Sequence, residues 1–356
     1  MTKQFPRTGP GRVIAPDGAS DRDGLRVHCP LMSTATAGTP RLPSAPRALV
    51  LGEALVDVID GVAFPGGSPL NVAVGLSRLD IPTQLASRFG DDAHGEQIAE
   101  HLRASRVRFS APVAGAETSR AEVFLNEAGQ ARYRFTLDSA LPETPLDGFE
   151  LVHAGSLGAV LAPGAETVAQ AFDAPGDLLR SYDPNIRPDL MTNRAATLAQ
   201  VEHLASRSHI VKLSDEDAEW LYPGAAPEAV LDRLLHLGAK LAVLTRGAAG
   251  CIAGTAHRTV TVPAERVVVA DTVGAGDSFM AALLAAALDG PLAVALRSAA
   301  PPDPAHVTAA LAYAAHAAGI TSSRVGSNPP RSDEMESRRA ATVSSNFIAN
   351  NQRLRS

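Results

Sequence analysis

Residues 271–288 read DTVGAGDSFMAALLAAAL, a glycine-containing turn followed directly by an apolar run. Gly274 and Gly276 let the backbone turn tightly, so that the N–H groups of residues 274–277 point at one spot. The apolar run predicts a buried helix that begins at this spot, and the N-terminus of a helix favours an anion. Asp277 adds a carboxylate at the edge of the turn. The stretch therefore predicts an anion-binding turn with an acid beside it.

Three interpretations of this stretch are open. A dinucleotide-binding GxGxxG motif would need a glycine where Phe279 stands, and Asp277 would repel a pyrophosphate. In phosphoryl transfer, the N–H groups would stabilise charge on the moving phosphoryl group and the carboxylate would accept the proton of the attacking hydroxyl. A glycine turn with an acidic helix cap is the alternative without chemistry. The chain has neither a P-loop nor the HRD and DFG motifs of protein kinases.

Strand-like and helix-like segments alternate through residues 46–327. Apolar runs such as LVHAGS (151–156) and HIVKLS (209–214) are separated by helical patterns. This alternation predicts an α/β fold with a mostly parallel sheet covered by helices on both faces. SPLNVAVGLSRL (68–79) is expected to form a helix, with Ser68 as its cap and Pro69 at the first helical position.

One region breaks the alternation. AEVFLNEAGQARYRFTL (121–137) reads as two strands around a four-residue loop, which predicts a hairpin. We expect residues 55–65 and 110–138 to form a small β lid over a site at the edge of the sheet. Residues 1–45 and 328–356 lack a periodic apolar pattern, so we expect disordered extensions on either side of one folded domain at 46–327.

Composition excludes several classes of partner. The 356-residue chain is 45% hydrophobic with a net charge of −6, which provides no basic surface for nucleic acid or an anionic membrane. Cys29 and Cys251 stand outside any CxxC pair, which suits a reducing compartment. The sequence shows no secretory signal and no apolar run long enough to span a membrane. We therefore expect a cytoplasmic protein with no nucleic-acid or membrane partner.

Two further segments accompany the DTVGAGD turn. PGGSPLNVAVGLSRL (65–79) and SRFGDDAHGE (87–96), taken together with that turn, closely resemble the two signature regions of the ribokinase-like (PfkB) carbohydrate kinases. The likeness runs from about Val50 to Gly326. It implies a three-layer α/β/α domain with a small β lid that transfers the γ-phosphate of ATP to a sugar hydroxyl.

The resemblance also implies roles for single residues. Asp277 would be the catalytic base, and the backbone amides of Gly274, Ala275 and Gly276 would form the anion hole. The sugar hydroxyls would be held by an acid at the end of the first strand and by the first signature region. Those residues are Asp57, Gly66, Gly67 and Asn71.

Polar groups at three other predicted strand ends extend this assignment. Arg187 in SYDPNIRP (181–188) would clamp the phosphate or the sugar, with a plain salt bridge as the alternative. Lys212, Thr245 and Gly247 resemble positions on the nucleotide side of the family's site.

The expected cations are Mg²⁺ and K⁺. Where many family members have Asn-x-x-Glu, this chain has SDED (214–217), so Asp217 would act on Mg²⁺ through water. The family's monovalent-cation loop would use backbone carbonyls near Asp271 and Val273, with others near residues 309–324.

Several segments together resemble bacterial fructokinases, among them GEALVDVI (52–59), RYRFTLDSALP (132–142) and VKLSDEDAEWLYP (211–223). The expected reaction converts D-fructose and ATP to fructose 6-phosphate and ADP. The alternatives are a 2-keto-3-deoxygluconate kinase, another sugar or nucleoside kinase, and a catalytically silent regulatory relative that binds ligand. The expected ligands are a sugar and ATP, and the expected assembly is a homodimer.

Overall fold

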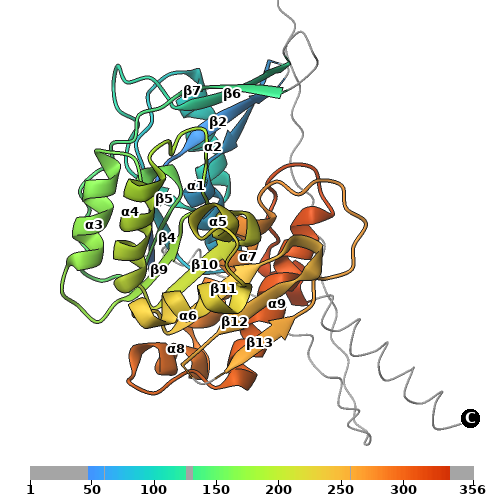
Figure 1. Cartoon of the computed structure of the whole chain (residues 1–356). Helices are drawn as coiled ribbons and strands as arrows, with labels where there is room; N and C mark the ends of the chain where they lie inside the picture. The colour runs from blue at the N-terminus through green and yellow to red at the C-terminus, as the bar shows by residue number, and fades with distance from the viewer. Residues whose placement is uncertain (1–46, 60, 126–130, 257, 337–356) are drawn as a thin grey trace, which may run out of the picture. The chain divides into compact units, whose positions relative to one another are not determined.

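The computed structural model of the chain describes residues 47–59, 61–125, 131–256 and 258–336 (Figure 1). The extension expected at 1–45 lies outside the described residues. Within the described part of the chain, no single helix has the length and apolarity to cross a membrane. The helices α7 (Ala275–Leu288) and α8 (Gly290–Arg297) meet the same criteria only when taken together, as a pair bent by 83°.

A nine-stranded sheet forms the centre of the described domain, in the order β13-β12-β11-β10-β9-β8-β1-β4-β5. Neighbours from β11 to β5 pair in parallel, whereas β12 and β13 pair antiparallel at one edge. The inner strands β1, β8 and β9 are buried along their whole length, as expected of strands covered on both faces. The strands are β1 (Ala48–Leu51), β4 (Thr83–Ala86), β5 (Arg108–Phe109), β8 (Leu151–Gly155), β9 (Leu179–Asp183), β10 (Ile210–Ser214), β11 (Leu241–Thr245), β12 (Cys251–Gly254) and β13 (Thr259–Val262).

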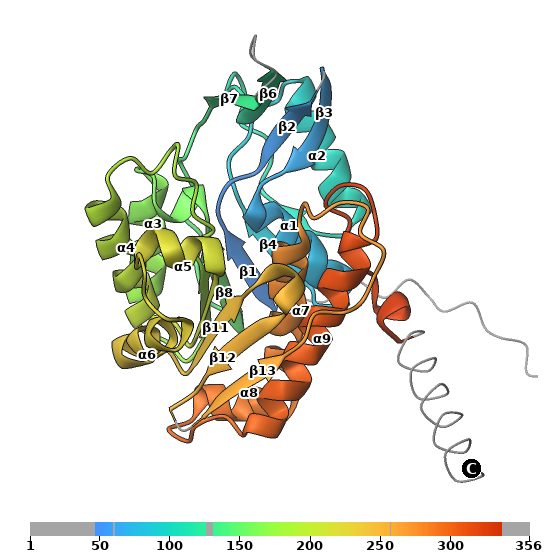
Figure 2. The ribbon, with the colours of Figure 1, turned by 45° about the vertical axis from the view of Figure 1, so that its right-hand side comes forward.

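Helices cover both faces of this sheet, and each layer closes its own apolar cluster (Figures 1 and 2). One layer holds α1 (Ser68–Arg78), α2 (Ala93–Ala104), α7 (Ala275–Leu288), α8 (Gly290–Arg297) and α9 (Pro304–Ser322). The other holds α3 (Gly164–Asp173), α4 (Arg194–Ser206), α5 (Asp215–Leu221) and α6 (Pro227–Leu237), with the short turns η1 (Leu157–Ala159) and η2 (Gly247–Ala249) nearby. The predicted layered α/β/α arrangement is therefore confirmed.

A second, four-stranded sheet rises from the carboxyl edge of the large one (Figure 2). The chain leaves β1 and, three residues later, enters β2, so the two sheets are joined directly. The order is β3-β2-β6-β7, with β2 parallel to β6 and the outer pairs antiparallel. Its strands are β3 (Val62–Gly66), β2 (Leu55–Ile59), β6 (Arg120–Leu125) and β7 (Ala131–Thr136). The predicted hairpin is β6–β7, and its loop, residues 126–130, lies outside the described residues.

The predicted C-terminal boundary at residue 327 is wrong, because residues 328–336 pack on the domain. The Arg78 guanidinium donates to Asn328 Oδ1 at 2.6 Å and to the Pro329 carbonyl at 2.8 Å. Met335 is 2% exposed and belongs to the α1–α7–α9 cluster. One buried methionine in a polar stretch produces no periodicity, which is why the pattern missed this segment. The rest of the predicted tail, 337–356, lies outside the described residues.

Candidate active site

A cavity of about 430 Å³ lies between the carboxyl edge of the large sheet and the small sheet. Most of the sequence-predicted residues line it, from both signature regions and from three strand ends. They are Asp57, Gly67, Asn71, Arg187, Lys212, Asp217, Thr245, Val273, Gly274, Gly276 and Asp277. The other four predicted residues, Gly66, Ala275, Gly247 and Asp271, are adjacent in sequence or structure but do not line the cavity wall.

The predicted anion-binding turn is the N-terminus of α7. Gly274 is the N-cap of α7, with φ at 73°. Glycine is required there both for this backbone conformation and because a side chain would collide with Ser327. The N–H groups in the first turn of a helix have no intrahelical partner, and this turn opens on the cavity. One of the predicted anion-hole amides is engaged here, because Ala275 N donates to the Thr272 carbonyl at 3.2 Å.

Both carboxylate oxygens of Asp277 accept hydrogen bonds from the first turn of α1. Ser68 Oγ donates to Oδ1 at 2.6 Å, and Asn71 Nδ2 donates to Oδ2 at 2.8 Å. The three side chains are 5–8% exposed. The expectation that Ser68 caps its helix is wrong: Gly67 is the N-cap, no side chain caps α1, and the Ser68 hydroxyl is committed to Asp277.

A buried lysine lies beneath the same turn. Lys212 Nζ in β10 bonds Asp183 Oδ2 at 2.8 Å, with Lys212 4% and Asp183 1% exposed. Burial alone would lower the pKa of Lys212, but the carboxylates of Asp183 and Asp217 outweigh it and raise that pKa. A Cβ added at Gly276 would lie 3.8 Å from Lys212 Nζ, so the ammonium group stands directly behind the turn. A fixed positive charge there suits phosphate oxygens.

Asp57 lines the same cavity as Asp277. It belongs to β2 of the small sheet, not to the end of the first strand as expected. Gly66 of β3 lies directly behind it, because a side chain at Gly66 would collide with Asp57 Oδ2. Burial raises the pKa of Asp57, and the nearby charge of Arg187 opposes this shift. Arg187 donates to Asn185 Oδ1 at 2.7 Å and to two backbone carbonyls rather than to a carboxylate.

Glu53, which the sequence patterns did not indicate, also lines the cavity. Its Oε2 accepts the N–H of Gly158 in η1 at 2.9 Å, and burial raises its pKa to about 6. Glu53 follows β1 by two residues. It therefore occupies the place at the end of the first strand that was assigned to Asp57, and that position was the signal for it.

The carboxylates at the two predicted cation positions, Asp217 and Asp271, accept hydrogen bonds from backbone N–H groups. Asp217 Oδ1 and Oδ2 accept the N–H groups of Ile186 and Ser214 at 2.7 and 2.8 Å, and the latter bond completes a capping box at the start of α5. The described residues contain no cluster of three or more metal-ligating side chains. Asp271 accepts the N–H groups of Val273 and Gly326, which lowers its pKa. The backbone beside it bonds Ser322 at the end of α9.

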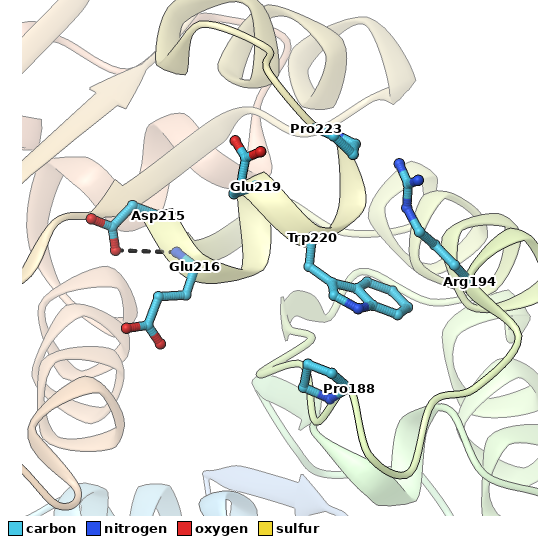
Figure 3. A pocket seen from close by; sticks show the side chains of 7 residues that line it. All are labelled: Pro188, Arg194, Asp215, Glu216, Glu219, Trp220 and Pro223. Carbon is cyan, nitrogen blue, oxygen red and sulfur yellow. Dashed lines mark hydrogen bonds between the residues drawn. The ribbon is translucent and has the colours of Figure 1, made fainter.

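A larger hollow of about 690 Å³ lies on the outer side of α5 (Figure 3). Trp220, Pro188 and Pro223 form its apolar part, and its charged side chains are exposed to solvent. Glu216 lines both hollows. The smaller cavity is the candidate site despite its size, because it holds the buried charged groups and the anion-binding turn.

Comparisons with known proteins agree with this geometry. The profile of the family described as "pfkB family carbohydrate kinase" matches residues 46–334. A fructokinase of Rhizobium leguminosarum bv. trifolii is 37% identical over 256 residues, which cover 67% of this chain and 78% of that protein. Fructokinase-1 of Oryza sativa subsp. japonica is 29% identical over 302 residues, covering 81% and 91%.

Among solved structures, fructokinase with bound ATP from Xylella fastidiosa superposes with a TM-score of 0.71 at 26% identity. The match covers 82% of this chain and 98% of that one. The predicted family and fold class are confirmed by these matches, and so is the prediction of a sugar phosphotransferase. The chain belongs to the pfkB family of carbohydrate kinases.

Proposed function

We propose that this protein is an ATP-dependent fructokinase that converts D-fructose and ATP to fructose 6-phosphate and ADP. The observation that carries the proposal is the placement of Asp277, a buried carboxylate at the N-terminus of α7 that faces the same cavity as Asp57. The cavity thus joins an acid beside an anion-binding turn to a second acid suited to sugar hydroxyls. The fructokinases to which the chain is similar supply the substrate.

In the proposed reaction the oxygen of the fructose 6-hydroxyl attacks the γ-phosphorus of ATP, and Asp277 accepts the proton of that hydroxyl. A new O–P bond forms, the bond to the bridging β–γ oxygen breaks, and ADP leaves with that electron pair. The backbone amides of residues 274–276 stabilise the charge on the phosphoryl group in transit. Ala275 would take part by releasing the Thr272 carbonyl.

The nucleotide would lie along β10 and β11, which carry Lys212 and Thr245, next to Gly247 in η2. Lys212 would face the phosphates, because its ammonium lies behind the anion-binding turn. Mg²⁺ bound with ATP would neutralise phosphate charge, and Glu216 and Asp217 are the carboxylates that line the cavity on this side. Each Asp217 oxygen uses one lone pair on backbone N–H groups and keeps another for a metal-bound water. A K⁺ ion would bind carbonyls near Asp271 and Val273, beside the end of α9.

The sugar would lie against Asp57 and Gly67, with Asn71 and Arg187 on its flanks. One observation favours a second candidate. Among the described residues, Arg187 donates hydrogen bonds to neutral oxygens only. Its positive charge is therefore available to pair with a substrate carboxylate, which 2-keto-3-deoxygluconate would offer. As part of the same proposal, the enzyme acts in the cytoplasm as a homodimer.

The test is sugar-dependent ADP release at saturating ATP and Mg²⁺, measured for fructose, 2-keto-3-deoxygluconate, ribose and adenosine. We expect the highest kcat/KM with fructose, because buried groups paired with particular hydroxyls reject an analogue that lacks them. A higher kcat/KM with 2-keto-3-deoxygluconate would make that acid the substrate. Absence of ADP release with every sugar would refute the kinase. Light scattering of the purified protein measures its assembly.

A further inference from the structure

Ser68 stands where a helix-capping residue is expected, but it caps nothing. It opens α1 after Gly67, and its hydroxyl donates instead to Asp277 on α7, 209 residues along the chain. The Oγ–Oδ1 distance of 2.6 Å is in the range of hydrogen bonds to a charged acceptor, which are stronger than neutral ones. The bond is buried, so water does not compete with it.

Asn71 completes a two-donor clamp. Residues three apart lie on the same face of a helix, so Ser68 and Asn71 both face Asp277 from the first turn of α1. Each takes a different carboxylate oxygen, which fixes the plane of the carboxylate as well as its position. The two helices are also held at close range, because a side chain at Gly75 would collide with Ala281 of α7. The orientation of Asp277 is therefore set by α1.

We propose that Ser68 is a positioning residue that orients the Asp277 carboxylate for proton transfer from the sugar. This inference rests on the proposed function, in which Asp277 is the base. Ser68 keeps its own proton throughout, and the proton that moves passes from the sugar hydroxyl to Asp277. With one lone pair of each oxygen held by α1, the remaining lone pairs face the cavity that the sugar occupies.

A double-mutant cycle tests the proposal. Ser68→Ala should lower kcat roughly 10-fold to 100-fold, because a base that is free to rotate is less often aligned with the hydroxyl. The KM for ATP should stay within about two-fold, because Ser68 acts through the base alone. In an Asp277→Asn background, adding Ser68→Ala should leave kcat unchanged, since no base remains to be positioned. Ser68→Thr, which keeps a hydroxyl, should restore part of the loss.

The matched control is Ser208→Ala, which also removes a buried serine hydroxyl bond, to the Leu204 carbonyl, at a residue that does not line the cavity. It should leave kcat unchanged. An unchanged kcat in Ser68→Ala would overturn the proposal, as would an equal loss in the presence and absence of Asp277, because that loss would come from cavity shape. If Asp277→Asn alone kept normal kcat, or if wild type released no sugar-dependent ADP, the proposed function and this inference would both fall.

Discussion

The two acids proposed to act in the cavity, Asp277 and Asp57, are held in different ways. Both oxygens of Asp277 already have protein donors, Ser68 and Asn71. In contrast, no described residue donates a hydrogen bond to the Asp57 carboxylate, and burial raises the pKa of both Asp57 and Glu53. Groups that are buried without sufficient partners destabilise the folded state until a ligand supplies them. Under the proposed function, the base Asp277 is therefore held in place by the protein, whereas Asp57 is left without a protein donor and can accept hydrogen bonds from the sugar.

The largest expected effect separates chemistry from binding. Asp277→Asn removes the proton acceptor at almost constant volume, so kcat should fall by about 10²–10⁴-fold. Sugar and ATP affinities, measured by calorimetry, should stay close to wild type, because Asp277 does not depend on the sugar for its position. A folded Asp277→Asn protein with normal kcat would refute the assignment of the base.

The second effect belongs to Asp57. Asp57→Ala should lower kcat/KM for fructose by roughly 10-fold to 100-fold, because one or two hydrogen bonds to a carboxylate are lost. The KM for ATP should barely change. Asp189→Ala, at an exposed aspartate outside the cavity, is the control. If Asp57→Ala weakened ATP as much as fructose, the roles of the two acids would not be separable.

Glu53 should make the free energy of unfolding depend on pH. Its pKa is raised by burial from 4.5 to about 6, so the folded protein binds more protons than the unfolded chain between those values. The free energy of unfolding should therefore be highest, as far as Glu53 is concerned, below about pH 4.5. It should fall as pH rises through about 6, by about 2 kcal/mol in total.

Glu53→Gln should abolish this decline, since the amide oxygen still accepts the Gly158 N–H but carries no charge. Urea unfolding of both proteins at pH 5 and pH 7.5 measures the difference. If the free energy of unfolding depended equally on pH in the two proteins, the pKa of Glu53 would not be raised in the folded state.

The smallest effect on catalysis should come from the C-terminal segment, which packs behind α1. Removing residues 329–356 takes away Met335 and the carbonyl partner of Arg78, and should lower the free energy of unfolding by roughly 2 kcal/mol. Removing residues 1–44, which have no apolar pattern, should leave it unchanged. Thermal melts of both truncations test this contrast, and equal stability would mean that the packed segment contributes nothing.

The fold was largely predictable because its signals are periodic. Apolar strands alternate with helices in the structure as predicted, and the helix predicted at 68–79 is α1, Ser68–Arg78. The antiparallel edge strands β12 and β13 and the helices α5 and α8 were not predicted. They are short, and a short segment contributes too few residues for a period to appear.

The site was predictable as a set of residues but not as a set of contacts. Glycines and acids in one turn indicate an anion site, and the structure does bring Asp277, Asn71 and Asp57 to one cavity. The partner of each side chain depends on packing between α1 and α7, which no local pattern encodes. For this reason the sequence pattern predicts a helix cap at Ser68, whereas Glu53 does have a local signal, its place two residues after β1.

The central claim is that this cavity transfers phosphate from ATP to fructose with Asp277 as the base. The most direct measurement is ³¹P and ¹³C NMR of the product formed from ¹³C-labelled fructose, ATP and Mg²⁺ by the wild-type and Asp277→Asn proteins. We expect a phosphate ester at the C6 oxygen with wild type, and at least about 100-fold slower formation of this product by the variant. A phosphate at another carbon, release of inorganic phosphate alone, or equal product from both proteins would contradict it.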